Sequence, residues 1–464
     1  MYFERQSFLV AGLSRSGVAA SEFLRAHGAR VYVFDDLEEN SVMETQARLK
    51  EIGCIPVLKD ELERQTEACD ILVLSPGIPV DHPLPVSFRR AGKRIIGESE
   101  LGALFVKCPV VAVTGTNGKT TTVSMLENIF RAAGKNAIAC GNVGRPITSC
   151  IEELKDNGIA VAEISSFQLE TLTSLRPHIA VVLNISEDHL NRHYNMENYI
   201  FLKSRLIRNA TESEYVVLNH DDPVVRGFQE KTKGRVEWFS LKEKVNGAYL
   251  QDNNLCYKDE VIMRSEEFPL EGEHNLANAL AAIAAAKLMG VGNASIVAAL
   301  KSFQGIRHRI EKIGTLNGVC FIDDSKATNV DSSVKAIASM KGESVLLLGG
   351  KDKGYSYEPL FDAIKKSGVV HTVLYGENAF KILDAAVKSG YTALTLCRPF
   401  DLAVRIAYLT AKKGQSVLLS PASASFDSFK NYEERGDRFQ ELFKAFSKEA
   451  STAVEEEARE EAAE

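Results

Sequence analysis

The chain has 464 residues, of which 45% are hydrophobic and 25% charged, and this length exceeds a single hydrophobic core and predicts two to four domains. Its formal net charge of −7 provides no basic field for nucleic acid or an anionic membrane, so we expect neither as a partner. No apolar run is long enough to span a bilayer, nothing at the N-terminus resembles a signal peptide, and the 8 cysteines lie singly, so we expect a cytoplasmic protein with reduced thiols.

The first 106 residues predict a parallel α/β domain. A strand at 8–13 is followed by a glycine turn, a helix at 17–28 and a strand at 29–36, with further strands within 69–79 and 93–98. Strands that alternate with amphipathic helices are typical of a doubly wound sheet. We therefore predict a Rossmann-like domain at 1–106.

The glycine turn of this domain, "GLSRSG", resembles a dinucleotide fingerprint with one departure. Ser14 stands where the second glycine of the fingerprint lets backbone approach a pyrophosphate. This departure weakens a nicotinamide interpretation and leaves two alternatives, another nucleotide or a helix-start turn without ligand. The candidate nucleotide contacts are Ser14, Arg15, Ser16, Asp35 and Asp36.

A larger α/β domain is predicted at 107–305. Apolar strands are expected within 110–116, 136–142, 159–165, 178–186 and 215–222, and a helix at 274–290. The first strand leads into "GTNGKTTT", a shortened phosphate loop, because Val113 occupies the position of the first Walker A glycine. Such a loop directs backbone N–H groups and a helix N-terminus at phosphate oxygens. The alternative, a plain strand–turn–helix junction, does not explain the lysine and threonines that follow Gly118.

Polar residues at the ends of the other strands extend this site. Lys119 would contact the β- and γ-phosphates, and the Thr120 hydroxyl is a natural Mg²⁺ ligand. Glu163 ends an apolar strand and supplies the hard oxygen that Mg²⁺ prefers. A later strand leads to Asn184, Asp188 and His189; a histidine in this setting favours a functional role over a structural one.

A third α/β domain is predicted at 306–448, with strands within 318–325, 344–350, 371–377, 392–397 and 416–425. We expect it to be a second Rossmann-like domain. The residues at 449–464 form an acidic tail, for which a solvated helix and disorder are both open.

Eight stretches occur in a fixed order and identify the chain as similar to a known family. They are "TGTNGKTTT", "AEISSFQLE", "NISEDHLNRH", "EGEHNLANALAA", "GIRHRIEKIG", "FIDDSKATNVDS", "LLLGGKDKG" and "LSPASASFDSFKNYEERG". Together they resemble the Mur ligases, which attach amino acids to the peptidoglycan precursor. "GTNGKTT" is shared with folate polyglutamate ligases, whereas "DDSKATN" and the last stretch resemble the D-glutamate-adding branch.

The resemblance implies a three-domain fold, with an N-terminal UDP-binding domain, a central P-loop ATPase-like domain and a C-terminal amino-acid-binding domain. It implies ATP and two Mg²⁺ ions as cofactors, and UDP-N-acetylmuramoyl-L-alanine and D-glutamate as substrates joined through an acyl phosphate. Two nucleotides explain why one chain carries two glycine turns. We expect the protein to be a monomer.

The resemblance also assigns roles to individual residues. The ATP contacts would be Gly115, Thr116, Asn117, Gly118, Lys119, Thr120 and Thr121, with Asn275, Asn278, Arg309 and Asp324 around adenine, ribose and γ-phosphate. The metal ligands would be Thr120, Glu163, His189 and a carbamylated Lys203, formed with CO₂. The UDP-substrate would also contact Asn142 and His189, and D-glutamate would contact Lys326, Thr328, Lys353, Ser425 and Phe426.

Simpler explanations remain open for several of these residues. The asparagines could cap a helix, Arg309 could form a surface ion pair, and Lys203 could be a lysine at the core edge with its charge in water. Rival functions for the chain are a sister Mur or folylpolyglutamate-type ligase, a nicotinamide dehydrogenase and a non-catalytic nucleotide-binding regulator.

Overall fold

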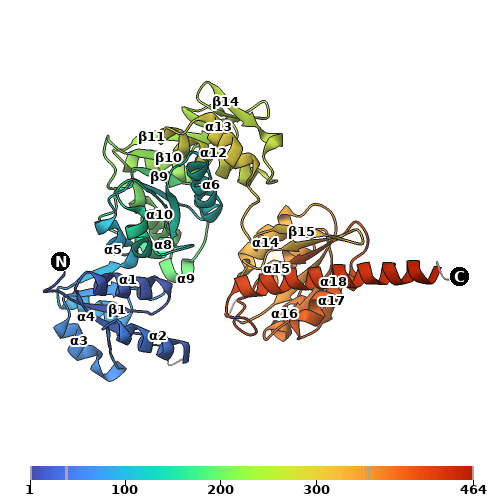
Figure 1. Cartoon of the computed structure of the whole chain (residues 1–464), viewed down its shortest axis with the longest axis horizontal. Helices are drawn as coiled ribbons and strands as arrows, with labels where there is room; N and C mark the ends of the chain where they lie inside the picture. Colours follow the sequence, from blue (N-terminus) through green and yellow to red (C-terminus); the bar gives the residue numbers. More distant parts are fainter. Residues whose placement is uncertain (1–2, 37–39, 353–355, 462–464) are drawn as a thin grey trace. The chain divides into compact units, whose positions relative to one another are not determined.

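The computed structural model describes residues 3–36, 40–352 and 356–461, and Figure 1 shows the course of the chain. The chain divides into two compact units, Met1–Gln304 and Gly305–Glu464, which are described separately below. The first unit contains two sheets and the second contains one. In the described ranges, no helix is both long and apolar enough to cross a membrane.

The first sheet has the strand order β3-β2-β1-β4-β5 and is parallel throughout. Apolar side chains cover both of its faces, as the doubly wound prediction requires. Its strands are β1 (Ser7–Ala11), β2 (Arg30–Phe34), β3 (Ile55–Pro56), β4 (Ile71–Leu74) and β5 (Arg94–Gly97). Its helices are α1 (Arg15–Ala26), α2 (Asn40–Glu51), η1 (Lys59–Glu61), α3 (Leu62–Ala68), α4 (Pro83–Arg90) and α5 (Glu98–Phe105).

The second sheet has the order β14-β13-β12-β11-β10-β9-β6-β8-β7 and places β6 between β8 and β9. Helices cover both faces; α6 packs against α12 and α13, and Figure 1 shows α6 beside α12. The strands are β6 (Val110–Thr114), β7 (Ala137–Gly141), β8 (Ile159–Glu163), β9 (Ile179–Val182), β10 (Tyr215–Asn219), β11 (Arg235–Ser240), β12 (Gly247–Gln251), β13 (Asn254–Tyr257) and β14 (Glu260–Arg264). The helices are α6 (Lys119–Ala132), η2 (Ile147–Cys150), α7 (Ile151–Leu154), α8 (Ser166–Leu169), α9 (Leu190–His193), α10 (Met196–Ser204), η3 (Arg205–Ile207), α11 (Pro223–Arg226), η4 (Gly227–Lys231), η5 (Ser265–Glu267), α12 (Glu273–Leu288) and α13 (Asn293–Lys301).

The strands from β11 to β14 were not predicted from the sequence. β12 and β13 pair antiparallel, as do β13 and β14, so this edge departs from an all-parallel sheet. Asp252 and Asn253 connect β12 to β13 with φ values of 49° and 58°. Two consecutive left-handed residues are the geometry of a tight two-residue hairpin, which Asp and Asn tolerate. The apolar alternation of these strands is too weak to stand out in the sequence.

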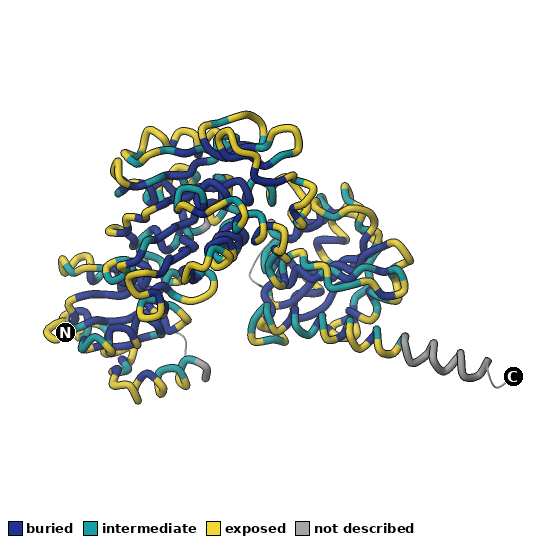
Figure 2. Tube along the Cα trace, turned by 45° about the horizontal axis from the view of Figure 1, so that its top comes forward, coloured by how far each residue is buried: buried dark blue, intermediate teal, exposed yellow. Residues whose placement is uncertain are grey.

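The third sheet has the order β15-β16-β20-β17-β18-β19, parallel except for β15 against β16. Figure 2 shows buried strands within each unit, and two apolar clusters cover the faces of this sheet. Its strands are β15 (Glu311–Leu316), β16 (Val319–Asp323), β17 (Ser344–Gly349), β18 (Val369–Tyr375), β19 (Leu394–Leu396) and β20 (Ser416–Leu419). Its helices are α14 (Val330–Ser339), α15 (Glu358–Ile364), α16 (Ala379–Lys388), α17 (Phe400–Thr410) and α18 (Tyr432–Glu461).

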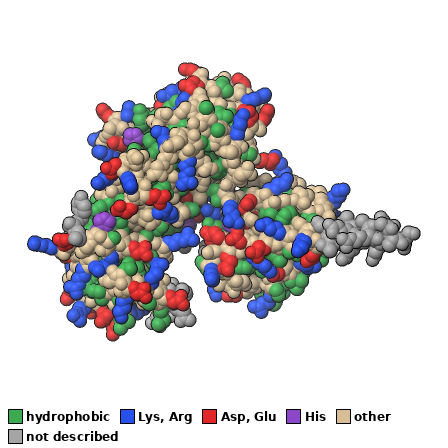
Figure 3. Space-filling model, viewed as in Figure 1, with side chains coloured by type: hydrophobic (Ala, Val, Ile, Leu, Met, Phe, Trp, Pro, Cys, Tyr) green, Lys and Arg blue, Asp and Glu red, His purple; other side chains and the backbone are tan. Residues whose placement is uncertain are grey.

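The helix α18 passes without a break through residue 448, where the acidic tail was predicted to begin, so the tail backbone is helical as far as Glu461. The charged side chains of both units are mixed in sign on the face shown in Figure 3. This mixture agrees with a small net charge of −7 over 464 residues.

Candidate active site

The candidate phosphate site lies at the carboxyl edge of the second sheet, where β6, β8 and β9 end side by side. Val113 of β6 pairs with Glu163 of β8, and Thr114 of β6 pairs with Val182 of β9. Ligands of parallel α/β sheets bind at this edge because loops from neighbouring strands meet there. The residues that follow the three strands are therefore brought together, as the sequence predicted.

Two glycines give the loop after β6 its shape. Gly115 has a φ of 151°, and Gly118, at the start of α6, has a φ of 85°, a left-handed conformation that disfavours side chains. A Cβ at Gly118 would also lie 2.2 Å from Oδ1 of the buried Asn278. The Lys119 ammonium donates to the carbonyls of Gly115 (2.9 Å) and Thr116 (2.8 Å), which holds its charge at the loop.

Asn184, which follows β9, braces this loop from the side. Its Oδ1 accepts from the N–H of Asn117 (2.8 Å), and its Nδ2 donates to the carbonyl of Asn117 (3.1 Å). The Asn184 carbonyl accepts from the N–H of Thr116 (2.8 Å). The sequence placed Asn184 near the loop. It did not reveal these hydrogen bonds, because Asn117 lies 67 residues away in the chain.

Glu163 offers an oxygen suited to a metal ion. Its side chain is 1% exposed, and its Oε1 accepts from Nδ2 of Asn142 at 2.8 Å. Its Oε2 is buried and finds no hydrogen-bond donor among the described residues. A buried carboxylate oxygen without a donor is costly unless a cation or water meets it. Together with the buried Thr120 at the start of α6, Glu163 fits the oxygen ligands of Mg²⁺.

Lys203 is buried beneath the same loop. It lies in α10, is 1% exposed, and its Nζ donates to the Gly115 carbonyl (2.9 Å) and to the Thr114 hydroxyl (3.2 Å). Burial, followed by repulsion from Lys119, lowers the pKa of Lys203 well below its usual value. The core-edge lysine with its charge in water, one of the alternatives from the sequence, is therefore wrong.

His189 stands directly before the short helix α9 and has a φ of 55°. Its Nε2 lies 3.4 Å from a carboxylate oxygen of Asp188, and its ring packs on Phe167 at a centroid distance of 4.8 Å. Partial burial and the nearby Lys119 and Lys203 lower the pKa of His189, against the effect of Asp188. A neutral imidazole of this kind is able to bind a metal.

The two asparagines of α12 differ in their surroundings. Asn278 is buried against Gly118, as described above. Asn275, one turn earlier, donates from Nδ2 to the Glu271 carbonyl at 2.8 Å. Asn278 therefore reaches the phosphate loop, while the adenine and ribose contacts of both residues remain predictions.

The N-terminal glycine turn lies at the carboxyl edge of the first sheet. A carboxylate oxygen of Asp35 accepts from the N–H of Leu13 (2.7 Å), which ties the end of β2 to the turn after β1. Ser14 is exposed and its hydroxyl lies 3.3 Å from that of Ser75. Asp36 instead makes surface ion-pair contacts with Lys59 and His82, both at 3.4 Å, and the nucleotide roles of these residues, with those of Arg15 and Ser16, remain predictions.

Asp324 occupies the carboxyl edge of the third sheet, directly after β16. One carboxylate oxygen accepts from the Ser420 hydroxyl (2.7 Å) and the other from the N–H of Ile310 (3.3 Å). Burial raises the pKa of Asp324 to about 7, although Ser420 and the charge of Arg309 act in the opposite direction. Arg309 is thus close enough to influence Asp324 electrostatically.

This raised pKa predicts a pH-dependent stability. The folded state retains the proton of Asp324 well above the usual carboxyl pKa of 3.8. Below that pH the carboxyl is protonated in both the folded and the unfolded state, and the free energy of unfolding is at its full value. As the pH rises from there through 7, the unfolded state loses its proton first, so the free energy of unfolding falls. Asp324→Asn cannot ionise, so it should gain up to roughly 4 kcal/mol relative to the parent between about pH 4 and pH 8. Denaturant unfolding of both proteins across this range measures the gain. The exposed Asp362 supplies the control Asp362→Asn, and equal pH profiles for Asp324→Asn and the parent would contradict the assignment.

Of the predicted amino-acid contacts, Lys326, Thr328, Ser425 and Phe426 lie on loops at the same edge of the third sheet. The N–H of Thr328 donates to the Lys326 carbonyl (2.9 Å), and the N–H of Lys351 donates to the Ala424 carbonyl (2.8 Å), beside the buried Ser425. Phe426 is 65% exposed, and Lys353 lies outside the described residues. The Lys326 ammonium sits 5.7 Å from the ring centre of Tyr432, an aromatic residue that the sequence analysis did not single out.

Arg435 is a second residue of this region that the sequence did not reveal. It is completely buried, and its guanidinium donates to the Ser325 hydroxyl (2.9 Å), the Ser325 carbonyl (2.8 Å) and the Ser423 carbonyl (3.1 Å). It thereby joins the segment before Lys326 to the segment before Ser425. Its position in "YEERG" gave no signal, because an arginine among acidic residues usually marks a solvated helix face.

Comparison with known protein families gives three matches along the chain. Residues 6–97 match the N-terminal domain model of "Mur ligase MurD-like" proteins, residues 113–286 match the "Mur ligase middle domain", and residues 308–423 match the "Mur ligase, glutamate ligase domain". The three matches correspond to the three sheets.

Curated relatives and solved structures agree with these matches. The chain is 42% identical over 442 residues to UDP-N-acetylmuramoylalanine–D-glutamate ligase of Caldanaerobacter subterraneus, covering 95% of this chain and 98% of that protein. It is 39% identical to the ligase of the same name from Streptococcus mutans, covering 96% and 98%. The crystal structure of UDP-N-acetylmuramate–alanine ligase MurC from Thermotoga maritima matches with a TM-score of 0.61 at 18% identity, covering 95% and 99%, which shows a shared fold.

Proposed function

The chain belongs to the Mur ligase family, and we propose on this basis that it is an ATP-dependent ligase that joins D-glutamate to UDP-N-acetylmuramoyl-L-alanine. The observation that carries the proposal is the agreement along nearly the whole chain with relatives of that name. The phosphate loop with Lys119, Glu163 and Lys203 around it supports the ATP-dependent half of the reaction. The reaction belongs to peptidoglycan precursor synthesis, and we place the enzyme in the cytoplasm as a monomer.

The first step proposed is transfer of the γ-phosphoryl group of ATP to the carboxylate of the UDP-substrate, which gives an acyl phosphate and ADP. The N–H groups at the start of α6 and the Lys119 ammonium stabilise negative charge on the transferred phosphoryl group. Thr120, Glu163 and His189 would hold Mg²⁺, which when bound neutralises phosphate charge. Asn142 fixes the Glu163 carboxylate through its 2.8 Å hydrogen bond.

In the second step proposed, the amine of D-glutamate attacks the acyl carbon, phosphate leaves and an amide forms. Lys326, Thr328, Lys353, Ser425 and Phe426 are the proposed contacts for the amino acid. Lys326 contributes a cation whose position is supported by the ring of Tyr432. Arg435 fixes the two loops that carry Lys326 and Ser425.

We further propose that Lys203 is carbamylated. Only the neutral amine reacts with CO₂, and burial beside Lys119 lowers the pKa of Lys203. The Lys203 nitrogen forms a bond to the carbon of CO₂ and releases one proton, so a neutral amine becomes an anionic carbamate that the charge of Lys119 attracts. The carbamate also supplies a carboxylate-type oxygen near the proposed metal ligands.

The experiment that tests the proposed function measures phosphate release from ATP by the purified protein. Release should require both UDP-N-acetylmuramoyl-L-alanine and an amino acid, and D-glutamate should be the best acceptor in a panel. Release with a different amino acid as the best acceptor would favour a sister ligase. Absence of release, with nucleotide binding retained, would favour a regulator.

Lys353→Ala tests the proposed acceptor site. Charge-assisted bonds to a shielded carboxylate contribute roughly 1.5–3 kcal/mol, so the KM for D-glutamate should rise by about ten- to a hundredfold, with the KM for ATP little changed. Steady-state kinetics with each substrate varied in turn measure both constants. The matched control is Lys351→Ala, since Lys351 lies in the same sequence stretch but pairs with Glu377 at 2.7 Å. An unaltered D-glutamate response of Lys353→Ala would show that the acceptor site is misplaced.

A further inference from the structure

Arg192 lies between the two sheets of the first unit, in the short helix α9. Figure 1 shows α8 and α9 on the side of the second sheet nearest the first sheet. The Arg192 side chain is 13% exposed, and that of its partner Glu170 is 7% exposed. Nε and Nη2 of Arg192 donate to the two carboxylate oxygens of Glu170 at 3.0 and 2.6 Å. A two-point contact of this kind fixes the plane of the guanidinium as well as its position.

The same guanidinium also reaches the turn that follows β4 of the first sheet. Nη2 donates to the carbonyls of Ile78 (3.0 Å) and Pro76 (3.4 Å), and Nη1 donates to that of Gly77 (3.4 Å). Three successive carbonyls of one turn therefore converge on one side chain that lies more than a hundred residues further along the chain. Lysine could not reproduce this pattern, because it lacks the planar fork of donors.

The turn 75–78 held by Arg192 lies beside the glycine turn that carries the proposed UDP contact Ser14. It follows β4, which pairs with β1, so it lies beside the glycine turn after β1. A Cβ at Gly12 would be 2.5 Å from Cβ of Ser75, and the Ser75 hydroxyl lies 3.3 Å from that of Ser14. The two turns are thus in direct contact at the carboxyl edge of the first sheet, where ligands of such sheets bind.

The other end of α9 leads to the proposed metal site. His189 directly precedes α9, and its carbonyl accepts from the N–H of Arg192 at 2.9 Å. The Arg192 guanidinium lies 5.1 Å from the ring centre of Phe167, and that ring also packs on His189. A single, largely buried side chain therefore connects the turn 75–78 with the segment that carries His189.

We propose that Arg192, fixed by Glu170, is a positioning residue that holds the turn 75–78 in place for the UDP-substrate and aligns it with the segment of His189. The proposal rests on the proposed function, because it concerns the binding of the same UDP-substrate. Arg192 acts through the backbone of the turn and needs no contact with the reacting atoms. Loss of Arg192 should therefore weaken the binding of the UDP-substrate and leave the binding of ATP and D-glutamate largely intact.

The decisive experiment compares steady-state kinetics of the full chain and of Arg192→Lys. The KM for UDP-N-acetylmuramoyl-L-alanine should rise about tenfold, while the KM values for ATP and D-glutamate stay within about twofold. Titration calorimetry with the UDP-substrate should show a matching loss of affinity. Arg208→Lys, at an exposed arginine of the same region, is the matched control and should behave as the parent.

A second variant separates positioning from folding. Removal of one partner of a buried ion pair leaves an unpaired charge, whereas removal of both is far less destabilising. Arg192→Gln combined with Glu170→Gln should therefore retain a thermal unfolding temperature near that of the parent, yet show the same selective rise in KM.

Three outcomes decide between the possibilities. An unchanged KM for the UDP-substrate in both variants would overturn the positioning role, as would an equal rise in all three KM values. Failure of the parent enzyme to turn over with the UDP-substrate and D-glutamate would instead overturn the proposed function itself. The kinetics of the parent are therefore measured first.

Discussion

Lys119→Ala is expected to lower ATP-dependent phosphate release by a factor of about 10² to 10³ or more, since charge on the transferred phosphoryl group loses its cationic partner. The protein should remain folded. The Lys119 side chain is partly buried, and its ammonium donates to two carbonyls of its own loop, those of Gly115 and Thr116. The Gly115 carbonyl also accepts from Nζ of Lys203 at 2.9 Å, and this bond is kept in the variant. Phosphate release and thermal unfolding of the same preparation measure the two effects.

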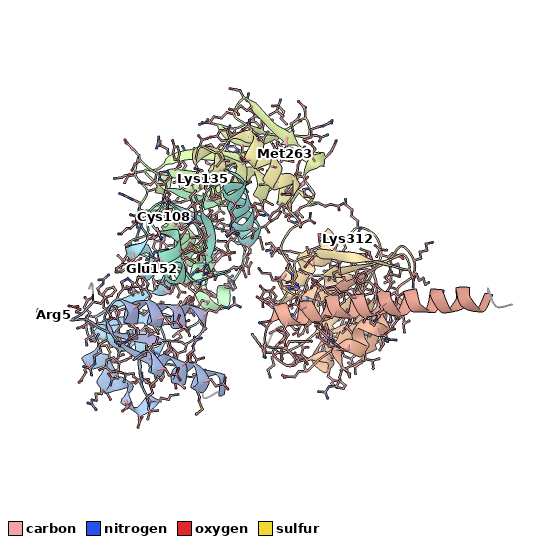
Figure 4. The ribbon with its side chains drawn as sticks, in the orientation of Figure 1. Arg5, Cys108, Lys135, Glu152, Met263 and Lys312 are labelled. Carbon is pink, nitrogen blue, oxygen red and sulfur yellow. The ribbon has the colours of Figure 1, made fainter. Side chains whose placement is uncertain are left out.

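Lys135→Ala is the control for this variant. Lys135 follows the end of α6, is exposed and is labelled in Figure 4, so its loss removes an equal charge at the opposite end of the same helix. Its activity should equal that of the parent. Near-normal turnover by a well-folded Lys119→Ala protein would contradict the assignment of the ATP site.

Lys203→Ala is expected to abolish most of the activity, by about a hundredfold or more, because a ligand-bearing group near the proposed metal site disappears. If the missing group is a carbamate, a small carboxylic acid such as formate should restore part of the activity by occupying the space that is left. If formate restores activity and a small amine does not, the group missing from Lys203→Ala is an anionic carbamate rather than a cationic ammonium. Activity is measured as phosphate release across a range of formate concentrations.

Lys231→Ala, at an exposed lysine of the same unit, should be active and insensitive to formate. Carbon-13 bicarbonate gives an independent readout, since the carbamate carbon should appear in the spectrum of the parent and be absent from that of Lys203→Ala. Normal activity of Lys203→Ala would refute the carbamate, and so would a parent enzyme that is active without any labelled adduct.

Much of the fold could be predicted because its signals are local. Apolar strands that alternate with amphipathic helices predicted the α/β class, and the family matches together with the parallel-rich sheets confirm it. The prediction was incomplete at the sheet edges. The strands β3, β11 to β14 and β15 were missed, because their pairing partners determine them as much as their own residues do.

In the candidate site, too, features with a local sequence signal could be predicted and features that depend on distant residues could not. The loop from Gly115 to Thr120 could be predicted because glycines, lysine and threonine stand within six consecutive positions, where a phosphate needs them. Glu163 and His189 could be placed near the loop since the carboxyl ends of parallel strands share one edge. Their roles, like those of the C-terminal contacts, remain predictions from the family.

By itself, the sequence determined the class of fold, the phosphate loop and membership of the family. Only the tertiary structure decided what surrounds each charged group. The burial of Lys203 against Gly115, 88 residues away, excluded the alternative of a lysine with its charge in water. Arg192 and Arg435 acquired roles only when carbonyls from distant turns converged on them. The physical reason is that the pKa and hydrogen bonding of a buried group depend on all neighbours that exclude water from it, and these neighbours are set by packing rather than by adjacency in the chain.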